Sequence, residues 1–237
     1  VELGNIQTAV YGCSYYSKEI MAPVYDSARP EHRQKYEILL AHGGDDRHIP
    51  MKVNQIQSLG YDYVAMGHIH KPQELVENHM AYAGALEPID INDTGTHGYI
   101  EGRISEKGCQ IRFVCHASRE YIHKDVQVHR AMTGHNLKQE LVRMIEENGR
   151  QNMYKITLTG FRDPDIWYDL EQMDPCGNVV EIVDHTKPAY DFEKLSNENK
   201  GNILGQYIES LKGYPQDSIE YQALCEGVQA LMETRRG

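Results

Sequence analysis

Two histidines, His68 and His70, stand one residue apart in the stretch YDYVAMGHIHKP at residues 61–72, directly after an apolar run and a glycine. Side chains two residues apart on an extended strand point the same way, roughly 6.5–7 Å apart. Both imidazoles can therefore face one metal ion, or each can face one of two ions about 3.5–4 Å apart. Gly67 removes a side chain where the strand ends, so the backbone can approach a metal closely. The alternative interpretation is an exposed strand on which two histidines have no function.

A second segment has the same form. The apolar run in KYEILLAHGG ends in His42 and is followed by two glycines, which predicts a histidine at the point where a strand opens into a flexible loop. Neutral imidazole is a common ligand for manganese, iron and zinc. The two segments together predict a metal site shared by His42, His68 and His70.

The loop after His42 holds three further polar residues. Asp45 and Asp46 are candidates for outer partners of the ligands, and a solvated loop is the simpler interpretation. His48 could face a substrate phosphate or be an ordinary loop residue. No substrate-binding residue is assigned from the sequence.

Composition limits the classes of function. The chain has 237 residues and 40% hydrophobic residues, which is sufficient for a globular core. The net charge of −11 argues against broad neutralisation of nucleic-acid phosphates, so a phosphate ester substrate would need bound metal ions to supply positive charge.

Cysteine usage and hydropathy bear on the compartment. The five cysteines are scattered and never spaced C-x-x-C, as expected of reduced thiols in a cytoplasmic protein. No apolar run predicts a membrane span, and the first residues do not resemble a signal peptide. The first residue is Val, so we expect the numbering to begin inside a longer gene product.

The hydrophobic pattern predicts an α+β protein in two parts. Strands are predicted over 7–15, 35–42, 61–68, 79–86, 98–104, 109–116, 153–161 and 178–185, and helices over 49–60, 134–150, 202–213 and 217–236. The pattern changes near residue 128, which divides a β-rich unit at 1–128 from a smaller α+β unit at 129–237.

The segments LLAHGG, YDYVAMGHIHKPQ and YAGALEPID together resemble the calcineurin-like metallophosphoesterases, and within them the SbcD-type DNA repair exonucleases. The Gly-His-x-His motif alone is shared by many phosphoesterases, and its combination with YAGALEP is more specific. The resemblance implies that 1–128 is the C-terminal half of a four-layer αββα sandwich. It also implies that 129–237 is the family's capping domain with its C-terminal helices.

The resemblance also implies roles for the three histidines. His42 and His68 would bind the same metal ion and His70 a second one. In this family two ions, manganese or similar, clamp a phosphodiester and activate a water molecule as the nucleophile. Partners implied in the same way are DNA, an SMC-like ATPase and a second copy of the chain; no membrane is expected.

The family's remaining ligands are missing from this sequence. They are an Asp-x-His, a Gly-Asp-x-x-Asp and a Gly-Asn-His-Asp/Glu, and the letters DRH at 46–48 stand in the wrong place to replace the first of them. Three neutral imidazoles divided between two ions would bind weakly. We therefore expect the isolated chain to be catalytically inactive, with weak or absent metal binding. Two alternatives stay open: a non-catalytic module that binds a partner, and a phosphoesterase that acts on nucleotides or small phosphoesters.

Overall fold

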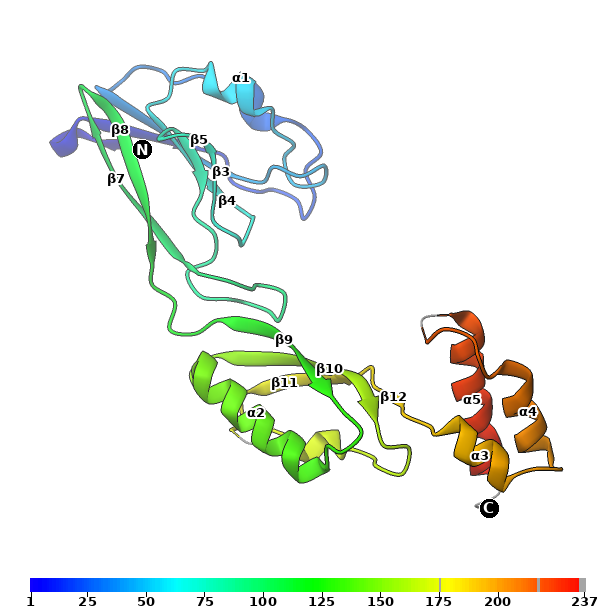
Figure 1. Cartoon of the computed structure of the whole chain (residues 1–237). Helices are drawn as coiled ribbons and strands as arrows, with labels where there is room; N and C mark the ends of the chain where they lie inside the picture. The colour runs from blue at the N-terminus through cyan, green and yellow to red at the C-terminus, as the bar shows by residue number, and fades with distance from the viewer. Residues whose placement is uncertain (175, 217, 235–237) are drawn as a thin grey trace. The chain divides into compact units, whose positions relative to one another are not determined.

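The computed structural model describes residues 1–174, 176–216 and 218–234. By its internal contacts the chain divides into two compact units, shown along the colour gradient of Figure 1. Unit 1 comprises Val1–Ile122 with Gln151–Met153, and unit 2 comprises His123–Arg150 with Tyr154–Gly237. The first boundary falls after Ile122, so nearly all of strand β9 (Tyr121–Val128) belongs to unit 2. The predicted boundary at residue 128 would place this strand in the first unit. Strand β9 belongs to unit 2 because it pairs with β10 of that unit.

Unit 1, whose residues are all described, is built on a six-stranded sheet in the order β1-β2-β3-β4-β6-β5. Strands β2, β3, β4 and β6 run parallel to one another, and β1 and β5 pair antiparallel with β2 and β6 at the two edges. The strands are β1 (Glu2–Leu3), β2 (Thr8–Gly12), β3 (Tyr36–His42), β4 (Tyr63–Gly67), β5 (Gln73–Val76) and β6 (Met80–Tyr82). A separate hairpin pairs β7 (Gly98–Ser105) with β8 (Gly108–Cys115).

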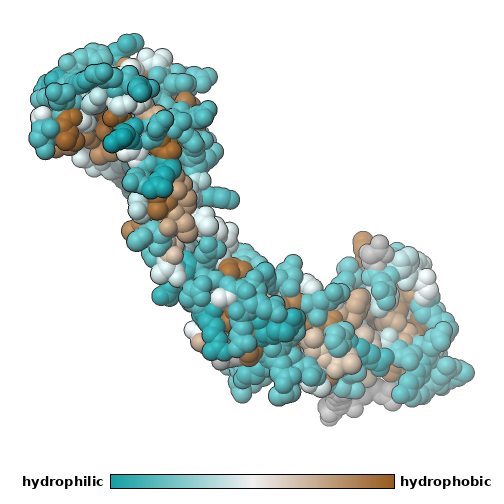
Figure 2. All heavy atoms as spheres, turned by 60° about the vertical axis from the view of Figure 1, so that its left-hand side comes forward, coloured by the Kyte–Doolittle hydropathy of each residue, from teal (hydrophilic) through white to brown (hydrophobic). Residues whose placement is uncertain are grey.

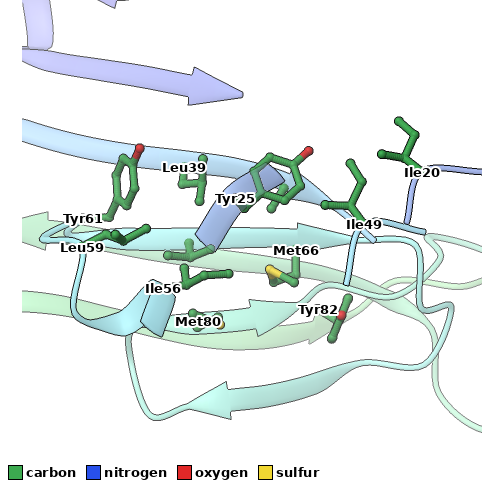
Figure 3. Close-up of a cluster of buried hydrophobic side chains, with 12 residues drawn as sticks. Ile20, Tyr25, Leu39, Ile49, Ile56, Leu59, Tyr61, Met66, Met80 and Tyr82 are labelled. Carbon is green, nitrogen blue, oxygen red and sulfur yellow. The ribbon is translucent and has the colours of Figure 1, made fainter. Parts of the chain in front are cut away.

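One face of this sheet carries the core of unit 1. The short helix α1 (Val53–Gln57) and the segment around Tyr25 cover it, as Figure 3 shows for the buried side chains. Leu39 of β3 is 1% exposed and Val64 of β4 is fully buried. Burial alternates along β3 because successive side chains point to opposite faces. The other face is partly open, and Leu40 is 52% exposed there.

Unit 2 combines a small sheet with helices. Its described strands are β9, β10 (Met153–Arg162), β11 (Val179–Asp184) and β12 (Lys187–Pro188), and β10 runs parallel to both β11 and β12. Helix α2 (Gly134–Asn148) begins at a capping box between Thr133 and Asn136. Its buried residues stand at helical spacing within the predicted helix 134–150: Leu137, Leu141, Met144 and Ile145.

Three short helices end the described chain. They are α3 (Phe192–Glu198), α4 (Ile203–Leu211) and α5 (Ile219–Glu233). Leu204 and Ile208 of α4 form a buried cluster with Leu224 and Val228 of α5, and Phe192 and Leu195 of α3 pack against it. The predicted last helix at 217–236 has its residues 217, 235 and 236 outside the described part of the chain. Short 3-10 turns occur at Gly4–Ile6, Val24–Ser27 and Leu170–Gln172.

The several sheets and few helices are compatible with the predicted α+β class. The four-layer sandwich stays a prediction. No helix in the described ranges is both long enough and apolar enough to cross a membrane.

The two faces of β3 can be compared directly by mutation. Leu39→Ala leaves a cavity in the core, and we expect it to lower the free energy of unfolding of unit 1 by about 2–5 kcal/mol. Leu40→Ala, at the next position, should cost about 1 kcal/mol or less because that side chain is half exposed. The single tryptophan, Trp167, lies in unit 2, so its fluorescence does not report on unit 1. Amide hydrogen exchange of β4 is therefore the suitable measurement of the stability of unit 1. Equal losses from both variants would show that the outer face of the sheet is also buried.

Candidate metal centre

His42 and the Gly67–His68 pair meet where two parallel strands end. His42 is the last residue of β3, Gly67 is the last residue of β4, and the two residues are opposite each other in the strand register. The carboxyl ends of parallel strands are a common place for ligand sites in α/β proteins. His68 follows directly, and its ring centroid lies 5.3 Å from that of His42.

Gly67 gives the ring of His42 its space. A Cβ atom built on Gly67 would lie 3.0 Å from Nδ1 of His42, which is tighter than ordinary van der Waals contact. The backbone N–H of His42 donates to the hydroxyl of Tyr25, which is fully buried. Tyr15 packs edge-on against the His42 ring and donates its hydroxyl to the His42 carbonyl, 3.1 Å away. Tyr15 thus contacts the ring and the carbonyl of His42, and Tyr25 holds its backbone N–H.

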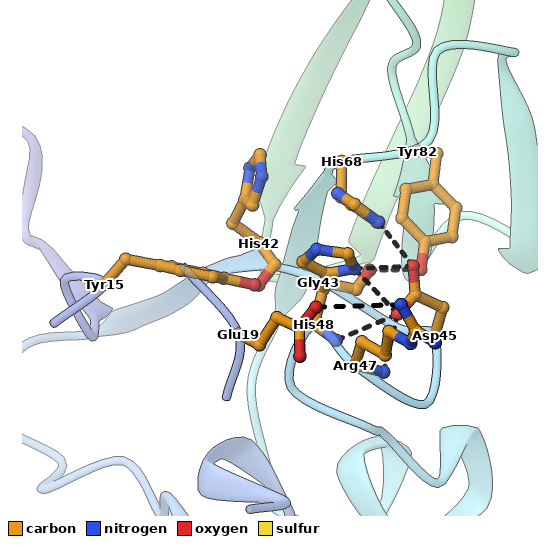
Figure 4. Close-up of polar contacts among 9 residues, drawn as sticks. All are labelled: Tyr15, Glu19, His42, Gly43, Asp45, Arg47, His48, His68 and Tyr82. Carbon is orange, nitrogen blue, oxygen red and sulfur yellow. Dashed lines mark hydrogen bonds and ion pairs between the residues drawn. The ribbon is translucent and has the colours of Figure 1, made fainter. Parts of the chain in front are cut away.

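The loop after β3 folds back toward His68. Gly43 and Gly44 have φ values of 141° and 117°, a region that favours glycine. The Gly44 N–H donates to the His48 carbonyl at 2.8 Å, and Tyr82 donates its hydroxyl to the Gly43 carbonyl at 2.8 Å. This path returns His48 to the strand ends, where its ring lies 4.5 Å from that of His68 between centroids. Figure 4 shows His48, His68 and Tyr82 gathered around Asp45.

Asp45 connects the two rings of His48 and His68. Its Oδ2 lies 2.7 Å from Nε2 of His68, and its Oδ1 lies 2.8 Å from Nδ1 of His48. The backbone N–H groups of Arg47 and His48 also donate to Oδ1. The hydrogen bonds from His68 and His48, followed by that from the Arg47 N–H, hold the pKa of Asp45 far below its ordinary value.

His68 has an unusual backbone. Its φ is 100°, a value that costs a residue with a side chain about 1–3 kcal/mol and that the surroundings must enforce. The strain directs the chain out of β4 and leaves His68 next to Asp45. Such strained residues are concentrated at functional sites.

His70 lies in a second polar group. Its Nδ1 is 3.0 Å from Oδ2 and 3.3 Å from Oδ1 of Asp93, whose side chain is only 13% exposed. Burial raises the pKa of Asp93, but the hydrogen bonds from the Ile89 N–H and from His70 outweigh burial, so the net shift is downward. The structure thus brings His42 and His68 together through their rings and sets His70, the third predicted residue, beside an aspartate.

Two sets of donor atoms in the described residues have the spacing that a cation requires. The donors of Asp45, His48 and His68 lie within 4.8 Å of one another, and so do those of His70, Asp90 and Asp93. Mixed imidazole and carboxylate donors at this spacing fit a divalent transition metal. His42 stands beside the first set through its contact with His68.

Sequence reasoning gave Asp45 and His48 only minor roles, and it did not single out Asp93. The paired glycines at 43 and 44 indicate that the loop after His42 turns sharply, but they do not indicate which residues the loop then contacts. Asp93 lies in the stretch EPIDINDTGTH, which the sequence marks only as a turn.

The protonation of His42 follows from its surroundings. Burial lowers the pKa of His42, and the charges of His68 and His48 lower it further. The ring is therefore neutral at neutral pH, which is the form that binds metals.

Comparison with known proteins gives one informative similarity. No family model matches the chain. A stretch of 104 residues is 32% identical to the uncharacterized metallophosphoesterase YhaO of Bacillus subtilis strain 168, and it covers 40% of this chain. The match spans 26% of that relative, so the chain corresponds to about a quarter of its length. Over this stretch the chain is therefore similar to a protein named as a metallophosphoesterase.

We expect Gly67→Ala to displace the ring of His42, because the new methyl group would press on Nδ1. Ring signals of His42 in ¹H–¹⁵N NMR spectra should shift while the amide spectrum of unit 2 stays unchanged. Gly4→Ala is the matched control, since a Cβ there meets no atom within 4 Å. An unmoved His42 ring in the Gly67 variant would contradict the packing described above.

We also expect His42 to titrate below the ordinary histidine pKa of about 6.5 in metal-free protein. His68→Gln should move this pKa upward by removing one positive charge, without restoring the ordinary value because burial remains. His185→Gln in unit 2 should leave it unchanged. The stability contributed by neutral His42 is present above the unfolded-state pKa and is lost as the pH falls through the folded-state pKa. An NMR titration that finds a raised pKa for His42 would refute this account.

Proposed function

We propose that this chain carries part of the two-metal site of an SbcD-type phosphodiesterase that cuts DNA. The observation that carries the proposal is the meeting of His42 and His68 at adjacent strand ends, with Asp45 and His48 beside them. A rigid sheet fixes the histidines, and neighbouring groups fix their rings. The similarity to a metallophosphoesterase supports the same class of chemistry.

In this proposal His42 and His68 hold one ion and His70 holds the other. Two bound divalent ions, manganese in our proposal, would supply the positive charge that binds a phosphodiester and the activated water that attacks it. The residues of this chain position the ligand nitrogens, and burial lowers the pKa of His42 so that its ring is neutral. Tyr15 and Tyr25 keep His42 at the end of β3.

The net charge supports a requirement for metal. A chain with a net charge of −11 repels a phosphate ester. Cations bound at the strand ends would make the electrostatic potential positive at that place. We propose that acidic ligands outside these 237 residues complete the site, because the family's other ligand motifs are absent from the sequence. The same reasoning gives our expectation that the chain by itself does not turn over substrate.

The substrate class can be tested with matched substrates. We propose a DNA end as the substrate, with an SMC-like ATPase and a second copy of the chain as candidate partners. The alternative of a nucleotide or small phosphoester substrate predicts hydrolysis of mononucleotides and leaves DNA ends intact. If the chain is instead a non-catalytic module, neither DNA ends nor mononucleotides should be hydrolysed by the chain or by the complete protein.

The decisive experiment compares the chain with the complete product of its gene in the presence of Mn²⁺. We expect the complete protein to degrade DNA from its ends and the isolated chain to be inactive. Alanine at His42, His68 or His70 in the complete protein should lower kcat by about 10²–10³-fold or more. His185→Ala, an exposed histidine of unit 2, is the control and should keep wild-type activity.

Metal titration of the same variants tests the assignment of the ions. His42→Ala and His68→Ala should weaken the same metal, and His70→Ala should weaken the other. Equal loss at both sites in all three variants would refute this assignment. Turnover by the isolated chain that disappears in His70→Ala would overturn the prediction of inactivity.

A further inference from the structure

A cavity lies in unit 1 on the core side of the sheet, next to the glycine loop that follows β3. Its volume is about 260 Å³. Helix α1, the end of β4 and the strands β5 and β6 contribute its wall, together with Gly44 of the loop. Figure 3 shows four of the lining side chains: Ile56, Met66, Met80 and Tyr82. Voids larger than a water molecule are few in a packed core, so a cavity of this size is a distinct feature.

The floor of the cavity is buried and its rim is closer to solvent. On the floor, Ile56 and Met80 are fully buried and Met66 is 5% exposed. The partly buried side chains of the rim are Met51, Val53, Ile69 and Leu75. Gln73 of the rim is exposed, so a small molecule has access to the cavity from solvent at this side.

The lining is suited to an uncharged occupant. Among the described residues that line the cavity, none is charged, so an ion would lose its hydration shell without compensation. The Tyr82 hydroxyl already donates to the Gly43 carbonyl at 2.8 Å, and the Gly44 N–H donates to the His48 carbonyl at 2.8 Å. An ordered water molecule needs two to four polar partners, and this wall offers few.

An apolar occupant would gain free energy from the removal of its surface and of the cavity wall from water. An apolar cavity of about 150 Å³ is already sufficient to admit benzene. Three of the lining residues are methionines, Met51, Met66 and Met80, whose flexible side chains adapt to the shape of a ligand.

We propose that this cavity is a binding site for a small, uncharged, mainly apolar molecule of the size of one or two fused aromatic rings. The wall between the site and the loop after β3 is thin. A Cβ atom built on Gly44 would clash with the Tyr82 hydroxyl and lie 3.3 Å from the methyl carbon of Met51. An occupant in contact with Tyr82 or Met51 therefore changes the surroundings of Gly44.

Indole is a suitable uncharged probe for the metal-free chain labelled with ¹³C at the methionine methyl groups. We expect the signals of Met51, Met66 and Met80 to shift together and to saturate, and leucine variants assign them. Met144 and Met232 lie in unit 2, and their signals should stay unchanged. Indole-3-carboxylate, which adds a charge to the same ring system, should bind about 10-fold more weakly or worse. Unchanged methionine signals at the highest soluble indole concentration, or equal binding of the charged compound, would overturn the proposal.

A matched pair of valine variants tests the location of the site. Val53→Phe places a ring in the cavity and should weaken indole binding by about 10-fold or more. Val24→Phe is the control, because Val24 also packs against the core of unit 1 and is not one of the lining residues. Leu75→Phe is the second filling variant if Val53→Phe does not fold. Equal indole affinity in the filled and control variants would refute the site.

Backbone amides provide a separate readout of the same binding event. Indole should shift the amide signal of Gly44 and leave that of Gly108, in the turn between β7 and β8, unchanged. At a free indole concentration ten times Kd, amide exchange of β4 through unfolding of unit 1 should be slowed about 10-fold. Methionine shifts with an unchanged Gly44 amide and unchanged exchange would show surface binding and would contradict the proposal.

Discussion

The parallel pairing of β3 with β4 is the constraint on which the candidate site depends. It places His42 opposite Gly67, and the missing side chain of that glycine is the space into which the imidazole fits. A slip of one residue in this register would turn His42 to the other face of the sheet and separate it from His68. The core under the sheet, with Leu39 and Val64 buried, specifies the register through hydrophobic burial. The hydrophobic core therefore determines the position of the polar groups.

The strain at His68 is supported by contacts that lie around it. The left-handed backbone of His68 and the two glycines at 43 and 44 are neighbours across the strand ends, and the N–H of Gly43 donates to the Gly67 carbonyl at 3.2 Å. The Asp45 carboxylate then holds the side chain. The hydrogen bonds of this loop and strand end thus compensate for the backbone strain at His68. All of these residues lie in unit 1.

The strands that hold the site could be predicted from sequence because their apolar runs are short and end at glycine or histidine. Segments 35–42 and 61–68 contain β3 and β4, and the helical spacing of Leu137, Leu141 and Ile145 identifies the buried side of α2. Strand β9 was not predicted because its sequence, YIHKDVQV, has three consecutive polar residues at 123–125 and so lacks a clear apolar run. Asp45, His48 and Asp93 could not be placed, because their positions depend on loop paths set by left-handed residues and by contacts across more than twenty residues. Local pattern carries no information about such paths.

The half-exposed Leu40 on the outer face of β3 has a consequence for how the protein behaves in solution. Figure 2 shows hydrophobic surface among the polar residues of unit 1, at the top of the view. The net charge of −11 keeps copies of the chain apart by mutual repulsion, and dissolved salt screens that repulsion over about 8–10 Å at moderate ionic strength. Apolar contact between copies is not screened and is strengthened by sulfate or phosphate. The solubility of this chain should therefore decrease as such salts are added, so buffers of low ionic strength suit its handling.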